Sequence, residues 1–186
     1  MSFVIKERFY NEFMDRRLRK TEDAIQNALI DLVSKNGYEG LKMIDVIEKA
    51  DVNKSTFYLH YQSLLGVASA IEDKLIARIL DVLHDEPMAG ETVIGGVVNL
   101  VVRERKTFRA ILNISEGHFY RKLENNLMPV INELVPFKGD KEAVLYAKAS
   151  VFGSVFGVTR AFVLGSSRLD SKKLESELSK ILGLSD

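Results

Sequence analysis

Residues 41–61, LKMIDVIEKADVNKSTFYLHY, decide the fold of this chain. They predict two short helices joined by a tight turn. The first helix has a narrow apolar face made of Ile44, Val46, Ile47 and Ala50. The pattern breaks only at Asp51-Val52, which is too short a break for a loop between independent elements. This spacing is typical of a helix-turn-helix.

The second helix is predicted to follow Asn53, whose side-chain oxygen can accept a hydrogen bond from a backbone N–H one turn into the helix. Phe57 and Tyr61 are four residues apart and share a face that can pack inward. The outward face is predicted to carry Lys54, Ser55, Thr56, Leu59 and His60. Small polar groups, a cation and an imidazole suit the major groove of DNA. A helical hairpin inside an all-α core explains the same composition equally well.

Four short motifs occur in a fixed order within residues 20–67: Asn36-Gly37-Tyr38, Asp45-Val46-Ile47, the turn from Ala50 to Asn53, and Thr56-Phe57-Tyr58 with His60-Tyr61. In this order and spacing they resemble the N-terminal DNA-binding domain of the TetR family of bacterial transcriptional regulators. The resemblance covers about a quarter of the chain. It implies a homodimer whose two recognition helices enter successive major grooves of a pseudo-palindromic operator, about 34 Å apart.

The chain departs from the family pattern at four positions. Leu41 stands where a capping Thr is usual at the start of the second helix. Ile44 and Leu64 stand where cations are common, and each lost cation removes a phosphate contact and its counterion release. Asp51 replaces a Gly, which is compatible with the fold if Asp51 adopts the left-handed conformation. These departures predict weaker DNA binding or dependence on a protein partner.

Composition places the 186 residues among ordinary globular proteins, with 46% hydrophobic and 28% charged residues. The chain has no cysteine and three scattered histidines, so we expect no thiol chemistry, no metal site and no cofactor. We identify no catalytic constellation and no phosphate-binding glycine loop, and therefore do not expect an enzyme. A cytoplasmic location without a signal peptide is the simplest expectation.

The formal net charge is zero, which argues against a general nucleic-acid binder. Residues 1–20 nevertheless form a basic and aromatic extension. Arg19 and Lys20 lie in it, and the resemblance implies that this flank is near the DNA backbone. For any one of these cations a solvated helix face is the better explanation. Thr21 is predicted to cap the first helix of the DNA-binding domain, with acids in its first turn.

We expect an all-α chain with three parts: the extension 1–20, a three-helix DNA-binding head at 21–66, and a C-terminal helical bundle at 67–186 that dimerises. A long helix at 64–83 links head and body, and loops are expected at 84–90 and 136–140. Body helices are predicted at 92–105, 106–114, 115–135, 141–164 and 171–182. Pro129 is expected to kink the third of these.

Residues 141–164 are the most apolar stretch, but Lys148 and Arg160 inside it argue against a membrane span. Small residues at helical spacing beside aromatic ones indicate close helix packing there, within one chain or between two. The family resemblance favours a subunit interface formed by Ser150, Gly153, Ser154, Gly157, Leu174, Leu178 and Ile181. The body resembles the shorter C-terminal domains of regulators of dihydroxyacetone-kinase operons, some of which respond to a protein partner instead of a small molecule. The resemblance to the TetR family implies a small-molecule effector site between the linker helix and the body helices. Its expected lining is Phe108, His118, Phe119, Tyr120, Tyr146, Phe152 and Phe156.

The predicted partner is a double-stranded DNA operator, bound by Arg19, Lys20, Lys42, Asn53, Lys54, Ser55, Thr56, Tyr58, Leu59 and His60. Lys54, Ser55, Thr56 and Leu59 are expected to face bases, while Tyr58 and His60 hold the backbone. The expected function is a repressor released by a small effector of unknown identity. Two other functions remain open: a co-regulator that acts through a protein partner, and a ligand-binding helical protein with no regulatory role.

Overall fold

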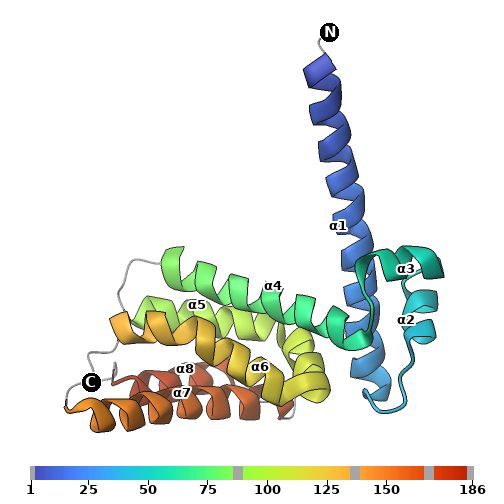
Figure 1. Ribbon diagram of the computed structural model, residues 1–186. Coiled ribbons are helices and arrows are strands. Elements are labelled where there is room, and N and C mark those ends of the chain that lie inside the picture. Colours follow the sequence, from blue (N-terminus) through green and yellow to red (C-terminus); the bar gives the residue numbers. More distant parts are fainter. Residues whose placement is uncertain (1–2, 86–89, 135–138, 166–169, 184–186) are drawn as a thin grey trace. The chain divides into compact units, whose positions relative to one another are not determined.

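The computed structural model describes residues 3–85, 90–134, 139–165 and 170–183. Within these ranges the chain forms α-helices and no strand, which confirms the all-α prediction (Figure 1). The helices are α1 (Phe3–Asn36), α2 (Met43–Lys49), α3 (Lys54–His60), α4 (Leu64–Asp85), α5 (Gly90–Arg103), α6 (Arg105–Leu134), α7 (Lys141–Leu164) and α8 (Ser171–Ile181).

Two compact units divide between Ala70 and Ile71, within α4. In the N-terminal unit α2 packs against α1 and α3 packs against α2. The core of this unit is formed by apolar side chains that share helical faces: Ile25, Leu29, Val33, Val46, Ile47, Phe57 and Val67. Val46, Ile47 and Phe57 therefore pack in the core as predicted, whereas Ile44, predicted on the same apolar face, is 46% exposed.

The first helix differs from the prediction at its start. α1 is continuous from Phe3, so Thr21 does not begin a helix. The Thr21 hydroxyl instead donates to the carbonyl of Arg17 at 3.1 Å, the usual bond of a threonine inside a helix. The cap signal was overridden because the preceding residues already form helix, and extending a helix costs far less than nucleating one.

The turn between α2 and α3 has the predicted backbone conformation. Asp51 has φ of 53°, the left-handed region that Asp tolerates better than most residues. The missing threonine at position 41 is offset in part at the start of α2. There the Asp45 carboxylate accepts the backbone N–H of Lys42 at 2.8 Å.

In the C-terminal unit α5 packs on α8, and α7 packs on both α6 and α8 (Figure 1). The last turn of α7 is bound by a side chain from the start of α6. The Arg105 guanidinium donates to the carbonyl oxygens of Phe162 at 3.0 Å and Gly165 at 2.9 Å, and lies 5.1 Å from the centre of the Phe162 ring. A cation here satisfies carbonyls that a helix end leaves unpaired and complements the helix dipole.

α6 changes direction at Ser115, whose φ of −152° and ψ of 42° are not helical. This agrees with the predicted break between residues 114 and 115. Pro129 lies inside α6, and its expected kink stays a prediction. A buried carboxylate from α4 lies against this bend. Glu72 is 0% exposed and accepts from the Ser115 hydroxyl at 2.7 Å and from His118 Nδ1 at 2.8 Å.

By length and composition α7 could cross a membrane. In the structure, 17% of its most apolar window is buried. It carries Lys148 and Arg160 along its length. The Arg160 guanidinium donates to Glu116 Oε1 at 2.7 Å, an ion pair that suits an aqueous surface. Much of the apolar face of α7 is therefore uncovered within one chain.

Candidate nucleic-acid interface and apolar pocket

The position of α3 is set by the residue before it. Asn53 has an extended backbone, with φ of −79° and ψ of 160°, and its Oδ1 accepts the backbone N–H of Thr56 at 2.7 Å. The Ser55 hydroxyl donates to the same oxygen at 2.7 Å. The cap predicted from sequence is confirmed, and it fixes the first turn of a helix only seven residues long.

The inner face of α3 is anchored in the N-terminal core. Phe57 is fully buried, and the buried Tyr61 hydroxyl accepts a hydrogen bond from Gln26 Nε2 at 2.6 Å. Burial raises the pKa of the Tyr61 phenol above its ordinary value of 10.0, although the Gln26 bond lowers it in part. The neutral hydroxyl is thus the form that the folded unit favours.

The outer face of α3 is open and has mixed chemistry. Lys54 and Ser55 are exposed, and the Leu59 residue is 77% exposed. Ser55 and Leu59 are four residues apart and therefore lie on one side of the helix. Because the Ser55 proton is donated to Asn53, its oxygen is available outward as an acceptor. The face can thus combine a cation, an acceptor and an apolar contact, which are groups that distinguish base pairs in the major groove.

Two recognition-helix residues differ from the predicted orientation. The His60 side chain is only 6% exposed, and its Nδ1 lies 3.3 Å from Glu22 Oε1 on α1. The expectation that His60 is on the outer face is therefore wrong, because a partner 38 positions earlier turns it inward. Thr56 is half-buried. Tyr58 is exposed, with its ring edge-to-face against Phe57 at 5.7 Å.

The remaining cations predicted to contact DNA are on the surface of the same unit. Arg19, Lys20 and Lys42 are all exposed. The two apolar replacements at family cation positions behave differently: Ile44 is exposed on α2, whereas Leu64 is buried at the start of α4. Leu64 is therefore part of the core, and of these two replacements Ile44 is the one that leaves an apolar side chain on the surface.

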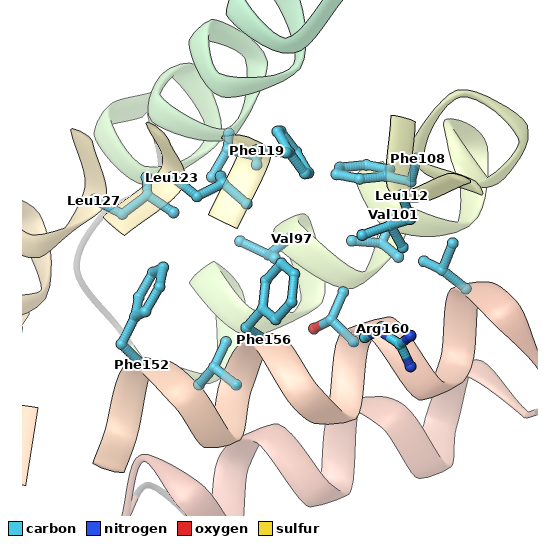
Figure 2. Close-up of a pocket in the computed structure, with 14 residues that line it drawn as sticks. Val97, Val101, Phe108, Leu112, Phe119, Leu123, Leu127, Phe152, Phe156 and Arg160 are labelled. Carbon is cyan, nitrogen blue, oxygen red and sulfur yellow. The ribbon is translucent and has the colours of Figure 1, made fainter. Parts of the chain in front are cut away.

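The C-terminal unit contains an apolar pocket with about 570 Å³ of empty space, part of it open to solvent (Figure 2). Its walls come from α4, α5, α6 and α7. Fourteen residues line it: Ile79, Val97, Val101, Phe108, Leu112, Phe119, Leu123, Leu127, Phe152, Val155, Phe156, Thr159, Arg160 and Val163. Twelve of them are apolar, which is usual for a site that takes a small organic molecule.

Four of the seven residues predicted for this pocket line it: Phe108, Phe119, Phe152 and Phe156. The prediction is wrong for the three polar-tipped residues. His118 points to Glu72, and the exposed Tyr146 donates to Glu142 at 3.2 Å. Tyr120 packs edge-to-face behind Phe152 and Phe156, at 5.2 and 4.8 Å between ring centres.

Sequence reasoning missed the polar end of the pocket, formed by Thr159 and Arg160. A signal for it was present, because Phe152, Phe156 and Arg160 are spaced by four and share one face of a helix. The Glu116 carboxylate beside it raises the pKa of the Arg160 guanidinium, so this end of the pocket carries a permanent positive charge.

Comparison with known proteins agrees with this geometry. The sequence profile of "bacterial regulatory proteins, tetR family" matches residues 25–68, which include α2, the turn at Asp51 and α3. Residues 25–68 therefore match the DNA-binding domain of the TetR family. Among solved structures, a TetR transcriptional regulator from Streptococcus agalactiae 2603V is similar over 92% of this chain and 99% of that chain, with a TM-score of 0.69 and 21% identity.

Two further comparisons concern transcriptional regulators. The dihydroxyacetone kinase operon activator DhaS has a TM-score of 0.63 at 16% identity, covering 87% of this chain and 93% of that chain. An uncharacterised HTH-type transcriptional regulator, YxbF of Bacillus subtilis strain 168, is 32% identical over 76 residues. That match covers 40% of this chain, and the chain spans about a fifth of the length of this curated relative (20%). The two structural likenesses show that the chain shares the fold of these regulators.

The residues predicted to join two TetR-family subunits fall into two groups. Leu174 and Leu178 are buried within this chain, where α8 packs on α5 and α7, so their expected place in a subunit interface is wrong. Gly153 is half-exposed, Ile181 is half-buried, and Ser150, Ser154 and Gly157 are exposed. A methyl group added at Gly153 or Gly157 would meet no atom within 4 Å beyond its own helix backbone.

Proposed function

We propose that this chain is a homodimeric, sequence-specific DNA-binding transcriptional regulator whose operator binding is relieved by a small effector. The observation that carries the proposal is the two-faced recognition helix. Phe57 and Tyr61 hold α3 in the core, while Lys54, Ser55 and Leu59 stay open to a groove. A helix of seven residues with this division is suited to base readout, because its inner face fixes the position of its outer face.

The proposal extends to a dimer because of the uncovered face of α7. Leu145 and Tyr146 are exposed there, near Gly153 and Gly157 with open space over their backbone. A second copy packed on this face would remove apolar surface from water and allow close helix approach at the glycines. Two recognition helices would then meet two half-sites of a pseudo-palindromic operator.

DNA binding is tested by selecting duplexes from a randomised library and titrating the selected sequence at two salt concentrations with excess competitor. We expect a competitor-resistant complex with two chains per site, weakened by salt. Lys54→Ala should cost about 1–3 kcal/mol of binding free energy, while the matched variant Lys180→Ala in α8 should bind as wild type. Failure to enrich any sequence at low salt would refute direct DNA recognition.

The dimer is tested by sedimentation equilibrium of Gly157→Leu beside Gly157→Ala. Alanine at an open helical position favours the helix by about 1 kcal/mol, so a fault in folding would not explain a change in mass. We expect Gly157→Leu to give monomers and Gly157→Ala to remain dimeric or to dissociate slightly more readily. A dimer unchanged by Gly157→Leu would place the subunit contact elsewhere.

A protein co-regulator is the second candidate function, and exposed apolar groups in the N-terminal unit favour it. Ile44 on α2 is exposed where the family commonly has a cation, and Leu59 on α3 is 77% exposed. Apolar groups contribute more to a protein contact than to phosphate binding. If the chain is a co-regulator, wild type should not bind DNA and Ile44→Lys should create DNA binding. If it is a DNA-binding regulator, wild type should already bind its operator, and Ile44→Lys should increase the affinity by no more than one phosphate contact.

A further inference from the structure

We propose that the pocket of the C-terminal unit takes an elongated apolar monocarboxylic acid, with its carboxylate at Arg160 and its tail between the aromatic side chains. This deepens the proposed function, since it names the class of effector for the same pocket. The argument depends on where charge lies in the pocket and on what competes for it.

The α7 wall of the pocket is apolar at Phe152, Val155 and Phe156 and polar towards its other end, where Thr159 and Arg160 precede the apolar Val163. Phe152, Phe156 and Arg160 follow one another at intervals of four residues on α7. At 1.5 Å of rise per residue, Phe152 and Arg160 are about 12 Å apart along the helix axis. Figure 2 shows them at opposite ends of this row, with Phe156 between them. A ligand that follows the row has an apolar body and one polar head.

The polar end is cationic and retains hydrogen-bonding capacity. Arg160 uses its Nε–H to bind Glu116 at 2.7 Å, and a guanidinium has five N–H donors in a planar fork. The Thr159 hydroxyl is the neighbouring polar group in the lining. A carboxylate matches one guanidinium in charge and can accept two parallel bonds from it. A doubly charged phosphate would be less well matched, because Arg160 is the single cation among the lining residues and already neutralises Glu116.

Glu116 gives the proposal a distinctive consequence. It lies on α6 one residue after the bend at Ser115, and its Oε1 is 2.7 Å from Arg160 Nε. An incoming carboxylate must therefore share the guanidinium with Glu116 or displace it. Removing the Arg160 charge should weaken acid binding, whereas removing the Glu116 charge should strengthen it. A merely structural ion pair would give the same sign for both substitutions.

The test is isothermal calorimetry on the full chain without DNA, using decanoate, decanol and decylammonium at pH 8 below their aggregation concentrations. We expect decanoate to bind about tenfold more tightly than decanol and decylammonium to bind least. Arg160→Gln should remove the preference of decanoate over decanol, and Glu116→Gln should increase it. Thermal unfolding of both variants without ligand shows whether they are folded, and Arg160→Lys, which retains the charge but not the fork, should give an intermediate preference.

Several results would overturn the assignment: equal binding of acid and alcohol by the wild type, weaker decanoate binding by Glu116→Gln, preference for the amine, or no binding of any of the three compounds. Because calorimetry uses no DNA, these failures are distinct from failure to bind an operator. Conversely, a chain that binds decanoate as expected but selects no DNA would support the pocket and refute the proposed regulator.

Discussion

Replacing Glu72 by alanine is expected to lower the free energy of unfolding by about 2–3 kcal/mol. The carboxylate is 0% exposed and accepts two short bonds, from Ser115 at 2.7 Å and from His118 at 2.8 Å. A hydrogen bond to a charged group contributes about 1.5–3 kcal/mol, and the cost of burying the charge offsets part of the two bonds. Lys122 adds little, because it lies 3.5 Å from Glu72 and also pairs with Asp73 at 2.8 Å.

The expected loss of stability in Glu72→Ala is smaller than the loss usual for breaking a buried ion pair, because the side chains that lose Glu72 can contact water. His118 is about half exposed, and Lys122 keeps Asp73. Glu72→Gln preserves shape and one acceptor, so about half of the loss is expected for it. Asp73→Ala is the matched control, since it removes the neighbouring exposed carboxylate and should cost under about 1 kcal/mol.

Thermal unfolding followed by circular dichroism measures the difference. For a chain of this size, about 2–3 kcal/mol corresponds to a fall in Tm of roughly 5–10 °C, while Asp73→Ala should lower Tm by about 3 °C or less. Equal shifts for Glu72→Ala and Asp73→Ala would refute the reasoning, because burial and bond geometry would then make no difference. A rise in Tm for Glu72→Ala would mean that desolvation of the carboxylate exceeds the bonds it makes.

Three further substitutions test individual contacts. Tyr61→Phe should cost about 1–2 kcal/mol at neutral pH, because Gln26 loses its buried acceptor. Since the pKa of the Tyr61 phenol is raised in the folded chain, wild-type stability is fully present below pH 10.0 and is lost as the pH rises through the folded value. Urea titrations at several alkaline pH values should show a smaller decline for Tyr61→Phe, and an identical decline would contradict the assignment. Asp51→Gly should raise the free energy of unfolding by about 0.5–1 kcal/mol, and with it the urea midpoint, because φ of 53° carries no steric cost for glycine. A lowered midpoint would count against strain at this turn. Arg105→Met should lower the free energy of unfolding by about 2–3 kcal/mol, because the carbonyl oxygens that end α7 lose their donor. Arg105→Lys should restore little of this stability, since a single ammonium cannot replace the planar guanidinium. Full stability of Arg105→Lys in the same urea assay would exclude that explanation.

Local signals in the sequence were sufficient to predict most helix ends. Asn53 was identified as the cap of α3, and α7 begins and ends as predicted, at Lys141 and Leu164. These features depend on bonds within one turn and on apolar periodicity, which neighbouring residues determine. The exception, Thr21, carried a correct local signal inside a helix that had already begun upstream.

Features that depend on distant residues were not predicted. His60 faces Glu22, which is on another helix, and Leu174 is buried by α5 and α7 instead of a second chain. Arg160 joins the pocket because α6 supplies the opposite wall. Periodicity identifies the face that a residue occupies but not the element that covers that face. The candidate site was therefore predicted where one helix suffices to define it and missed where two or more helices meet.

The brevity of α3 has a consequence for how the chain would read DNA. Seven residues are too few to form a helix unaided in water, so its order is supplied by Asn53, by Phe57 and by the tethers of His60 and Tyr61 to α1. If those tethers loosen, the fraction of molecules with an ordered reading surface falls, and the apparent affinity falls by the same factor for every sequence. Damage to the tethers would thus lower occupancy without changing the preferred site, whereas changes at Ser55 or Leu59 would change the preferred site itself. The inner face of α3 would therefore determine the affinity, and its outer face would determine the sequence preference.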